Sequence, residues 1–108
     1  MKKPASTPKN LTSEAKSIWR RLVVAYGIVD EGGFEILRTG LEAHDRMRGV
    51  QAQIKRDGVT FVDRFGQVKS HPLLSVERDA RAQYLAALKA LNLDLEPANH
   101  TIGRPGGS

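Results

Sequence analysis

The sequence predicts a mainly α-helical fold with three principal helices and a short β-hairpin between the second and the third. Three stretches repeat apolar residues at the spacing of one helical face, whereas residues 59–70 alternate apolar and polar residues around a turn signal. The 108 residues fit one domain, and one Trp, two Tyr and three Phe provide few large core residues. We therefore expect self-association to bury further surface.

The first helix is expected after a basic mobile arm, residues 1–10, which contains three lysines, two prolines and no apolar periodicity. In the following stretch, LTSEAKSIWRRLVVAYG, one helical face collects Ala15, Ile18, Trp19, Leu22, Val23 and Tyr26. Thr12 or Ser13 can cap the start of this helix, and Gly27 can adopt the left-handed conformation that ends it.

The second helix is expected over about residues 31–57, capped by Asp30. Its apolar stripe consists of Phe34, Leu37, Leu41, Met47, Val50 and Ile54. His44 lies within this face, which favours a packed or interfacial histidine over a metal ligand. Gly40 and Gly49 weaken the helix unless they allow a bend or close packing. We expect the first and second helices to pair as an antiparallel hairpin.

Residues 57–72, DGVTFVDRFGQVKSHP, predict two strands at 59–63 and 66–70. Asp63 suits the first position of a type I turn, and Gly66 suits the fourth. Strand alternation places Val59 and Phe61 on one face and Val62 with Val68 on the other. A lone hairpin is marginal in water, so both faces require cover. We expect the chain's own helices to cover one face and a neighbouring subunit the other, with Val59, Phe61, Val62 and Phe65 as the oligomer interface.

The third helix is expected to begin with Pro72 at its first position and to stop at Asn92. The helical domain therefore spans residues 11–92, with its hairpin at 59–70. Residues 93–108 are rich in proline and glycine and predict a linker and mobile tail. Within it, Gly103, Arg104 and Pro105 spell the GRP core of minor-groove hooks, but basic flanking residues are missing.

The net charge of +5 is concentrated at the N-terminus, because residues 30–108 contain equal numbers of acidic and basic residues. Residues 1–29 contain six basic residues and one acidic residue, Glu14. Such asymmetry favours a polyanion partner, and we expect double-stranded DNA. The predicted DNA-binding residues are Lys2, Lys3, Lys9, Lys16, Arg20 and Arg21.

The sequence gives no pattern for catalysis, for a metal or for another cofactor. There is no cysteine, and His44, His71 and His100 are too widely spaced to suggest a metal site. No phosphate-binding loop or nucleophile elbow is present. No apolar run approaches the length of a membrane span. We expect a cytoplasmic protein that is not an enzyme and needs no cofactor, metal or membrane.

The order of these segments resembles the small subunit of phage terminases. The resemblance rests on LTSEAKSIWRRLV, IVDEGGFEIL, the long second helix, DGVTF followed by GQVKSHP, and LLSVERDARAQYLAALKALNL followed by EP. It implies a ring-forming, non-enzymatic subunit that binds viral DNA and delivers it to the large terminase subunit. It also implies modulation of that subunit's ATPase and nuclease, in the cytoplasm of an infected bacterial host.

Two other functions remain possible on the residues alone. A small protein-interaction adaptor would use the same basic arm to contact an acidic protein. A dimeric DNA-binding regulator would need a recognition helix after a short turn, and the acidic connector IVDEGG leads into FEILRTGLEAHD, a poor major-groove reader.

Overall fold

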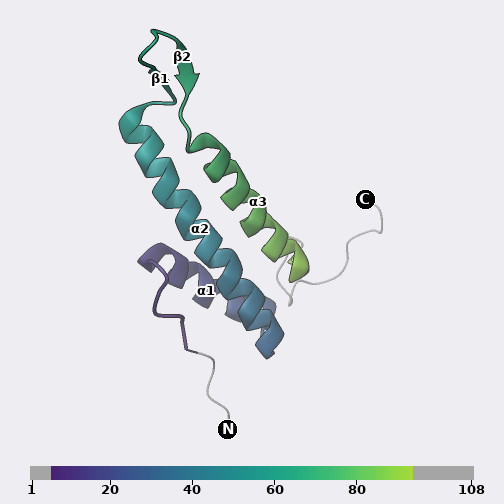
Figure 1. Ribbon diagram of the computed structural model, residues 1–108. Helices are drawn as coiled ribbons and strands as arrows, with labels where there is room; N and C mark the ends of the chain where they lie inside the picture. Colours follow the sequence, from purple (N-terminus) through teal and green to yellow (C-terminus); the bar gives the residue numbers. More distant parts are fainter. Residues whose placement is uncertain (1–5, 94–108) are drawn as a thin grey trace, which may run out of the picture.

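The computed structural model describes residues 6–93 and confirms the mainly helical prediction (Figure 1). The elements follow the expected order: α1 Ser13–Tyr26, α2 Glu31–Asp57, β1 Thr60–Val62, β2 Val68–Ser70 and α3 Leu74–Ala90. The predicted residues 1–5 of the arm and 94–108 of the tail, including the GRP segment, lie outside the described residues.

Local capping explains where the first two helices begin and end. The Thr12 hydroxyl accepts a hydrogen bond from the Ala15 amide at the start of α1, and Gly27 ends this helix with φ 63°. The Asp30 carboxylate accepts a hydrogen bond from the Gly33 amide at the start of α2. These three expectations are confirmed.

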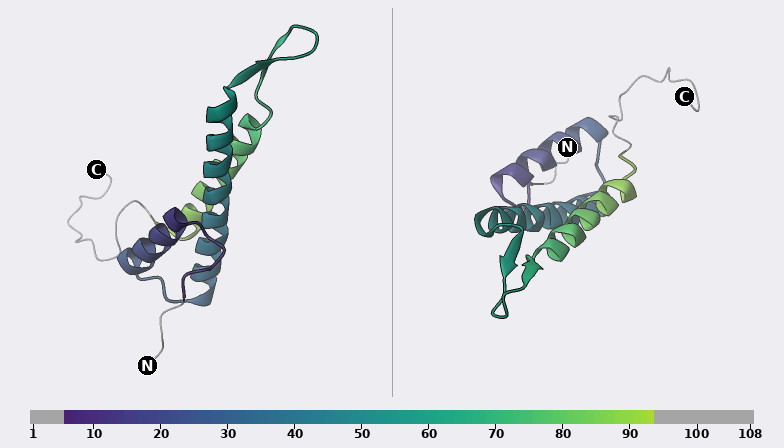
Figure 2. Two further views of the ribbon diagram at one scale, coloured as in Figure 1. Left: turned by 90° about the vertical axis from the view of Figure 1, so that its left-hand side faces the viewer. Right: turned by 90° about the horizontal axis from the view of Figure 1, so that it is seen from above.

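The close helical pair is formed by α2 and α3, which lie side by side (Figure 1). A Cβ on Gly40 would lie 2.5 Å from the Ala87 Cβ, so this glycine allows the two backbones to approach. The first helix instead crosses the N-terminal half of α2 obliquely (Figure 2). The first two helices pack against each other as expected, but α1 crosses α2 obliquely, and the more extensive contact of α2 is with α3, which the sequence did not predict.

The core lies where α1 crosses the N-terminal half of α2. Leu37 and Leu41 are almost fully buried there, and the Trp19 ring stacks on Phe34 with 5.7 Å between ring centroids. Each such apolar side chain contributes about 1.5–3 kcal/mol when it is buried. Burial of Trp19 fixes which side of α1 faces inward, and hence which side faces solvent.

The hairpin projects beyond the other end of the α2–α3 pair (Figures 1 and 2). Its register pairs Thr60 with Ser70, Phe61 with Lys69 and Val62 with Val68. The strands are shorter than predicted because the Asp63 carboxylate occupies the turn, accepting hydrogen bonds from the Phe65 and Gln67 amides. The Gly66 amide donates to the Asp63 carbonyl, and Gly66 has φ 78°, as the turn prediction required.

The third helix begins at Leu74, two residues later than predicted. The His71 ring explains the difference, since its Nδ1 accepts a hydrogen bond from the Leu73 amide at 3.0 Å and holds Pro72 and Leu73 in a turn. The His71 Nε2 also lies 2.8 Å from the Asp57 carboxylate. One buried histidine therefore joins the end of α2, the hairpin exit and the start of α3.

Candidate nucleic-acid interface

The solvent face of α1 carries three cations. Because Ala15 and Trp19 point into the core, Arg20 and Arg21 lie exposed on the outer side of the helix, and the half-buried Lys16 lies at the edge of that side. Within residues 6–93, none of the three side chains forms an ion pair or a side-chain hydrogen bond. The arrangement leaves three uncompensated positive charges on one rigid surface, which we call the α1 basic face.

The other predicted DNA-binding residues are more dispersed. Lys9 is exposed in the turn that precedes α1, and it too has no charged partner within residues 6–93. Lys2 and Lys3 lie outside the described residues. Asn10, expected in the arm, donates a hydrogen bond to Glu42 of α2, so the chain already contacts the helical body at that point.

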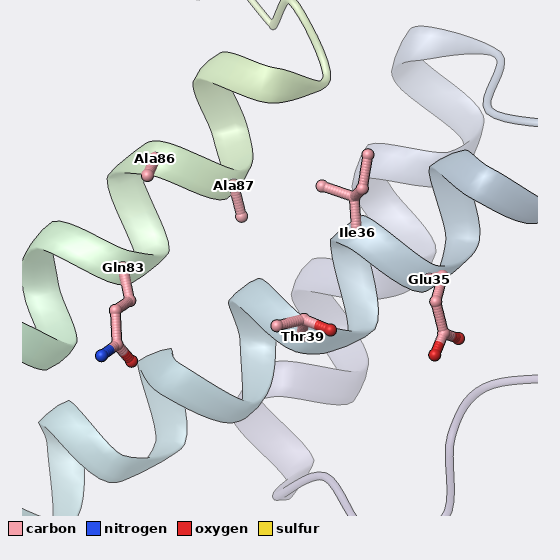
Figure 3. A pocket seen from close by; sticks show the side chains of 6 residues that line it. All are labelled: Glu35, Ile36, Thr39, Gln83, Ala86 and Ala87. Atoms are coloured by element: carbon pink, nitrogen blue, oxygen red, sulfur yellow. The ribbon is translucent and has the colours of Figure 1, made fainter.

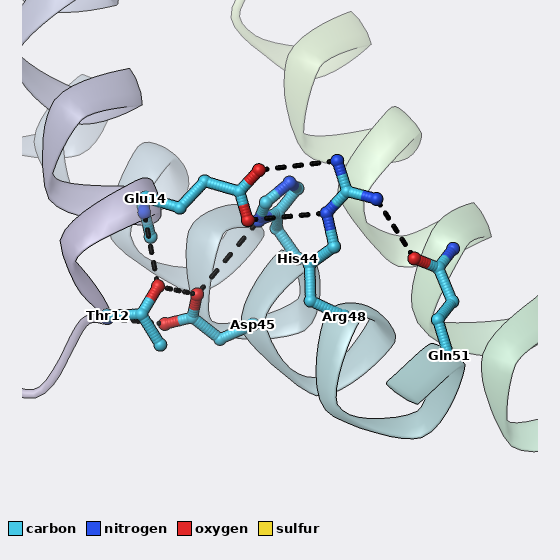
Figure 4. A network of polar contacts seen from close by, with 7 residues as sticks. Thr12, Glu14, His44, Asp45, Arg48 and Gln51 are labelled. Atoms are coloured by element: carbon cyan, nitrogen blue, oxygen red, sulfur yellow. Dashed lines mark hydrogen bonds and ion pairs between the residues drawn. The ribbon is translucent and has the colours of Figure 1, made fainter. Parts of the chain in front are cut away.

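The acid of α1 does not neutralise this face. Glu14 points toward α2, where its carboxylate pairs with the Arg48 guanidinium at 3.3 Å (Figure 4). Other arginines also have partners, such as Arg38 with Glu35 and Glu42, and Arg81 with Glu77. Some cations of α2 and α3, such as Lys55 and Lys89, are also unpaired within residues 6–93, so the α1 basic face is distinguished by having no acidic partner for any of its cations.

The start of α1 is fixed on the middle of α2 through Asp45 (Figure 4). The Thr12 hydroxyl donates to one carboxylate oxygen at 2.6 Å, and the Thr12 amide donates to the other at 2.9 Å. The neighbouring His44 is buried and meets the Tyr84 ring edge-on, which confirms a packed histidine. These contacts set the orientation of the α1 basic face relative to the body.

Sequence reasoning missed an apolar strip beside these cations. A shallow hollow of about 500 Å³ is lined by Arg20, Arg21, Val24 and Ala25, and Val24 is 82% exposed. The available signal was that Val24 falls outside the apolar stripe of α1. The face can thus offer guanidinium groups to phosphates and a methyl surface to the uncharged part of a ligand.

The predicted oligomer residues gather on the hairpin but are not covered by the chain's own helices. Val59, Phe61, Val62 and Phe65 are all exposed, from 44% for Phe61 to 74% for Phe65. The expectation that one face packs on the helices is therefore wrong, because the hairpin extends past their ends. The register puts Val62 beside Val68 on an uncharged face and Phe61 beside Lys69 on the other.

A second hollow lies between α2 and α3, at the end opposite the hairpin (Figure 3). It measures about 450 Å³ and is lined by Glu35, Ile36, Thr39, Gln83, Ala86 and Ala87. Across residues 6–93, no group of histidine and acidic side chains is arranged to hold a metal ion. None of the helices in this part of the chain has the length and apolar character needed to cross a membrane.

Comparison with known proteins identifies one family. A family model described as phage terminase, small subunit, matches residues 15–101, which is most of the chain. No curated protein and no solved structure matches this chain. The matched region contains the three helices and the hairpin in the order described above. The chain therefore belongs to the phage terminase small-subunit family and has a role in bacteriophage DNA packaging.

Proposed function

We propose that this small subunit recognises viral DNA and delivers it to the large terminase subunit, whose ATPase and nuclease it modulates without catalysing a reaction itself. The site of action is the cytoplasm of the infected bacterial host. The observation that carries the proposal is the α1 basic face, where Lys16, Arg20 and Arg21 have no acidic partner among residues 6–93. Membership of the terminase small-subunit family also supports a role in DNA packaging.

The chemistry of the face favours contact with the phosphate backbone of duplex DNA. Cations spaced along one helix can each neutralise a phosphate and release its counterions. Such contacts hold the protein on DNA and fix its orientation but do not read sequence. Lys2, Lys3 and Lys9 precede the helix in the sequence and add further positive charge to the chain.

One copy supplies few phosphate contacts, so binding by a single subunit is weak at physiological salt. A ring of copies presents the α1 basic face several times to the same duplex, and avidity then raises the overall affinity. The proposed ring uses the exposed hairpin residues Val59, Phe61, Val62 and Phe65 as its intersubunit contact. Their exposure supports this role, since a short apolar hairpin needs cover.

The test compares two double variants that remove equal charge. Arg20→Gln with Arg21→Gln neutralises the α1 basic face, whereas Arg78→Gln with Lys89→Gln neutralises exposed cations of α3. Binding to a fluorescent duplex is measured by anisotropy from about 50 to 200 mM salt. We expect the first variant to bind more weakly and to flatten the log–log salt slope by about 0.9 per lost phosphate contact.

Equal losses in both variants would contradict a localised DNA site and leave only a general charge effect. A wild-type protein that binds duplex DNA without a salt slope, or not at all, would favour the adaptor with an acidic protein partner. The regulator alternative has less support, because the exposed residues in the first turns of α2 include Glu31 and Glu35, which would face the phosphates of a groove.

A further inference from the structure

We propose that the hairpin tip of one copy docks into the hollow between α2 and α3 of the next copy, so that the chain assembles head to tail. The proposal rests on the ring assembly proposed above and names its two surfaces. The donor surface is the tip around Phe65. The acceptor surface is the hollow lined by Glu35, Ile36, Thr39, Gln83, Ala86 and Ala87, here called the α2–α3 hollow.

The acceptor is an apolar recess with a carboxylate beside it. Gly40 brings the two helices close, and the small Ala86 and Ala87 leave space above the point of contact, next to Ile36 (Figure 3). Its volume of about 450 Å³ exceeds that of one aromatic side chain, and Ala86 is exposed beside it. A single phenylalanine with its neighbours can therefore enter without moving either helix.

The donor is a preorganised tip rather than a loose loop. Asp63 fixes the turn through hydrogen bonds from the Phe65 and Gln67 amides, at 2.8 and 2.9 Å. The Phe65 side chain is 74% exposed, and the Arg64 guanidinium lies over its ring at 5.1 Å. Because the turn is already fixed, docking loses little backbone entropy.

Charge complementarity selects a second copy as the occupant. At the hairpin end, Lys55, Arg64 and Lys69 form no ion pair within residues 6–93, while Asp57 and Asp63 are engaged by His71 and by the turn amides. At the other end of α2, residues 30–42 carry four acids, Asp30, Glu31, Glu35 and Glu42, against the single cation Arg38, and Glu35 lines the hollow. Opposite charges at the two ends attract copies in a head-to-tail arrangement.

The Glu35 carboxylate keeps its charge at this position. A hydrogen bond from Arg38, with the positive charge of the same guanidinium, lowers the pKa of Glu35 below its usual value. Glu35 is therefore ionised at the edge of the acceptor, where it is paired with Arg38. The Arg64 guanidinium that accompanies Phe65 is the matching cation on the donor.

A contact within one chain is excluded by distance. From Ile36 at the hollow to Asp57 before the hairpin, α2 rises by roughly 30 Å. Donor and acceptor are also different surfaces, so the contact is heterologous and generates a ring or an open filament rather than a twofold dimer. Every copy in the interior of such an assembly both gives a hairpin and receives one.

Cysteine crosslinking tests this directly, because the natural chain contains no cysteine. Gln67→Cys, an exposed position of the tip that leaves the Phe65 ring in place, and Ala86→Cys are prepared as single variants of different mass, mixed, and treated with a short thiol crosslinker. We expect a covalent heterodimer from the mixture and a ladder of multimers from the double variant. Gln67→Cys mixed with Ser75→Cys, an exposed position near the other end of α3, is the control and should give no crosslinked heterodimer.

Two results would overturn the docking proposal. Efficient crosslinking of Gln67→Cys to itself, without reaction at Ala86→Cys, would show a hairpin–hairpin contact. Native mass spectrometry that shows an assembly in which the mixed pair fails to crosslink would exclude the hollow as acceptor. Neither result affects the measurement of DNA binding by the α1 basic face. The docking proposal can therefore fail while the proposed function stands, and the reverse.

Charge exchange provides a second test that does not depend on the crosslinker. Arg64→Glu alone and Glu35→Lys alone should each weaken assembly by about tenfold in sedimentation measurements, since like charges would meet. The two changes combined should restore it. Glu31→Lys, at the same end but outside the hollow, is the control partner for Arg64→Glu and should not rescue assembly. Equal rescue by both lysines would overturn the pairing of Arg64 with Glu35.

Discussion

Apolar side chains are buried at the N-terminal end of α2 but exposed on the hairpin that follows its C-terminal end. At the N-terminal end, Leu37 and Leu41 are almost fully buried beneath α1, and Trp19 completes the core. At the hairpin end, Phe61, Val62 and Phe65 remain exposed. The difference indicates that the helices stabilise the fold, whereas the hairpin presents surface for a contact outside the chain.

Polar contacts hold the hairpin itself, although Ile54 in the last turn of α2 is still buried. Asp63 closes the turn, and His71 links the hairpin exit to Asp57 and to the start of α3. A two-stranded hairpin has little stability of its own, so these contacts and a docked neighbour must hold it. Substitutions made at one end at a time test whether the two ends have these separate roles.

The largest expected difference comes from truncating one apolar residue at each end. Leu41→Ala should lower the free energy of unfolding by about 2–5 kcal/mol, because it opens a cavity in the core. Phe65→Ser removes an exposed ring and should change the free energy of unfolding of the isolated subunit by no more than about 0.5 kcal/mol. Urea denaturation followed by circular dichroism measures both.

Protein concentration serves as the control for this pair. Assembly adds a contribution to the free energy of unfolding that rises with protein concentration. Phe65→Ser should abolish this concentration dependence, whereas Leu41→Ala should retain it. A large loss of stability in dilute Phe65→Ser would contradict the division between the two ends. It would mean that the hairpin contributes to folding of the single chain.

The next effect comes from two glycines of the same helix. Gly40→Ala should destabilise by about 1–3 kcal/mol, because its Cβ would lie 2.5 Å from the Ala87 Cβ and force α2 and α3 apart. Gly49→Ala meets no atom within 4 Å and should stabilise the helix by up to ~1 kcal/mol. Urea denaturation of both variants gives the comparison.

A compensating change shows whether the loss arises at the helix contact. Combining Gly40→Ala with Ala87→Gly removes the clash, so the measured destabilisation should be smaller than the sum of the two single changes. Strict additivity would mean that the two positions do not touch in solution.

Features set by neighbours in sequence could be predicted. The caps of Thr12 and Asp30, the stop at Gly27 and the turn from Asp63 to Gly66 each depend on hydrogen bonds within a few residues. Helix periodicity likewise gave the inward face of α1, from which the outward position of Lys16, Arg20 and Arg21 follows. The position of these cations on α1 could therefore be predicted without knowledge of any tertiary contact.

Features set by distant neighbours could not be predicted in the same way. Periodicity identifies an apolar face but does not say which helix covers it, so the close α2–α3 pair was missed. The late start of α3 depends on the His71 side chain, and the α2–α3 hollow depends on Ala86 lying beside Ile36. The hairpin's lack of cover likewise follows from its position beyond the helix ends.

The smallest expected effect concerns acid and the polar anchor of the hairpin. Hydrogen bonds to the Asp57 carboxylate, from Gln53 first and His71 second, lower the pKa of Asp57 below its usual value of 3.8. The Leu73 amide donates to His71 Nδ1, so Nε2 carries the proton that reaches Asp57.

A carboxyl group whose pKa is lower in the folded state stabilises the fold above its unfolded pKa, and this contribution is lost as pH falls through the folded pKa. Wild-type melting temperatures should therefore decline from about pH 5 to about pH 3 more steeply than those of Asp57→Asn. Asp79→Asn is the control and should keep the wild-type slope, because the one ion pair of this carboxylate within residues 6–93 is with Arg78 at 3.9 Å. Equal slopes for wild type and Asp57→Asn would mean that the hairpin is held by its backbone and turn alone, and that the link from Asp57 to His71 adds no stability.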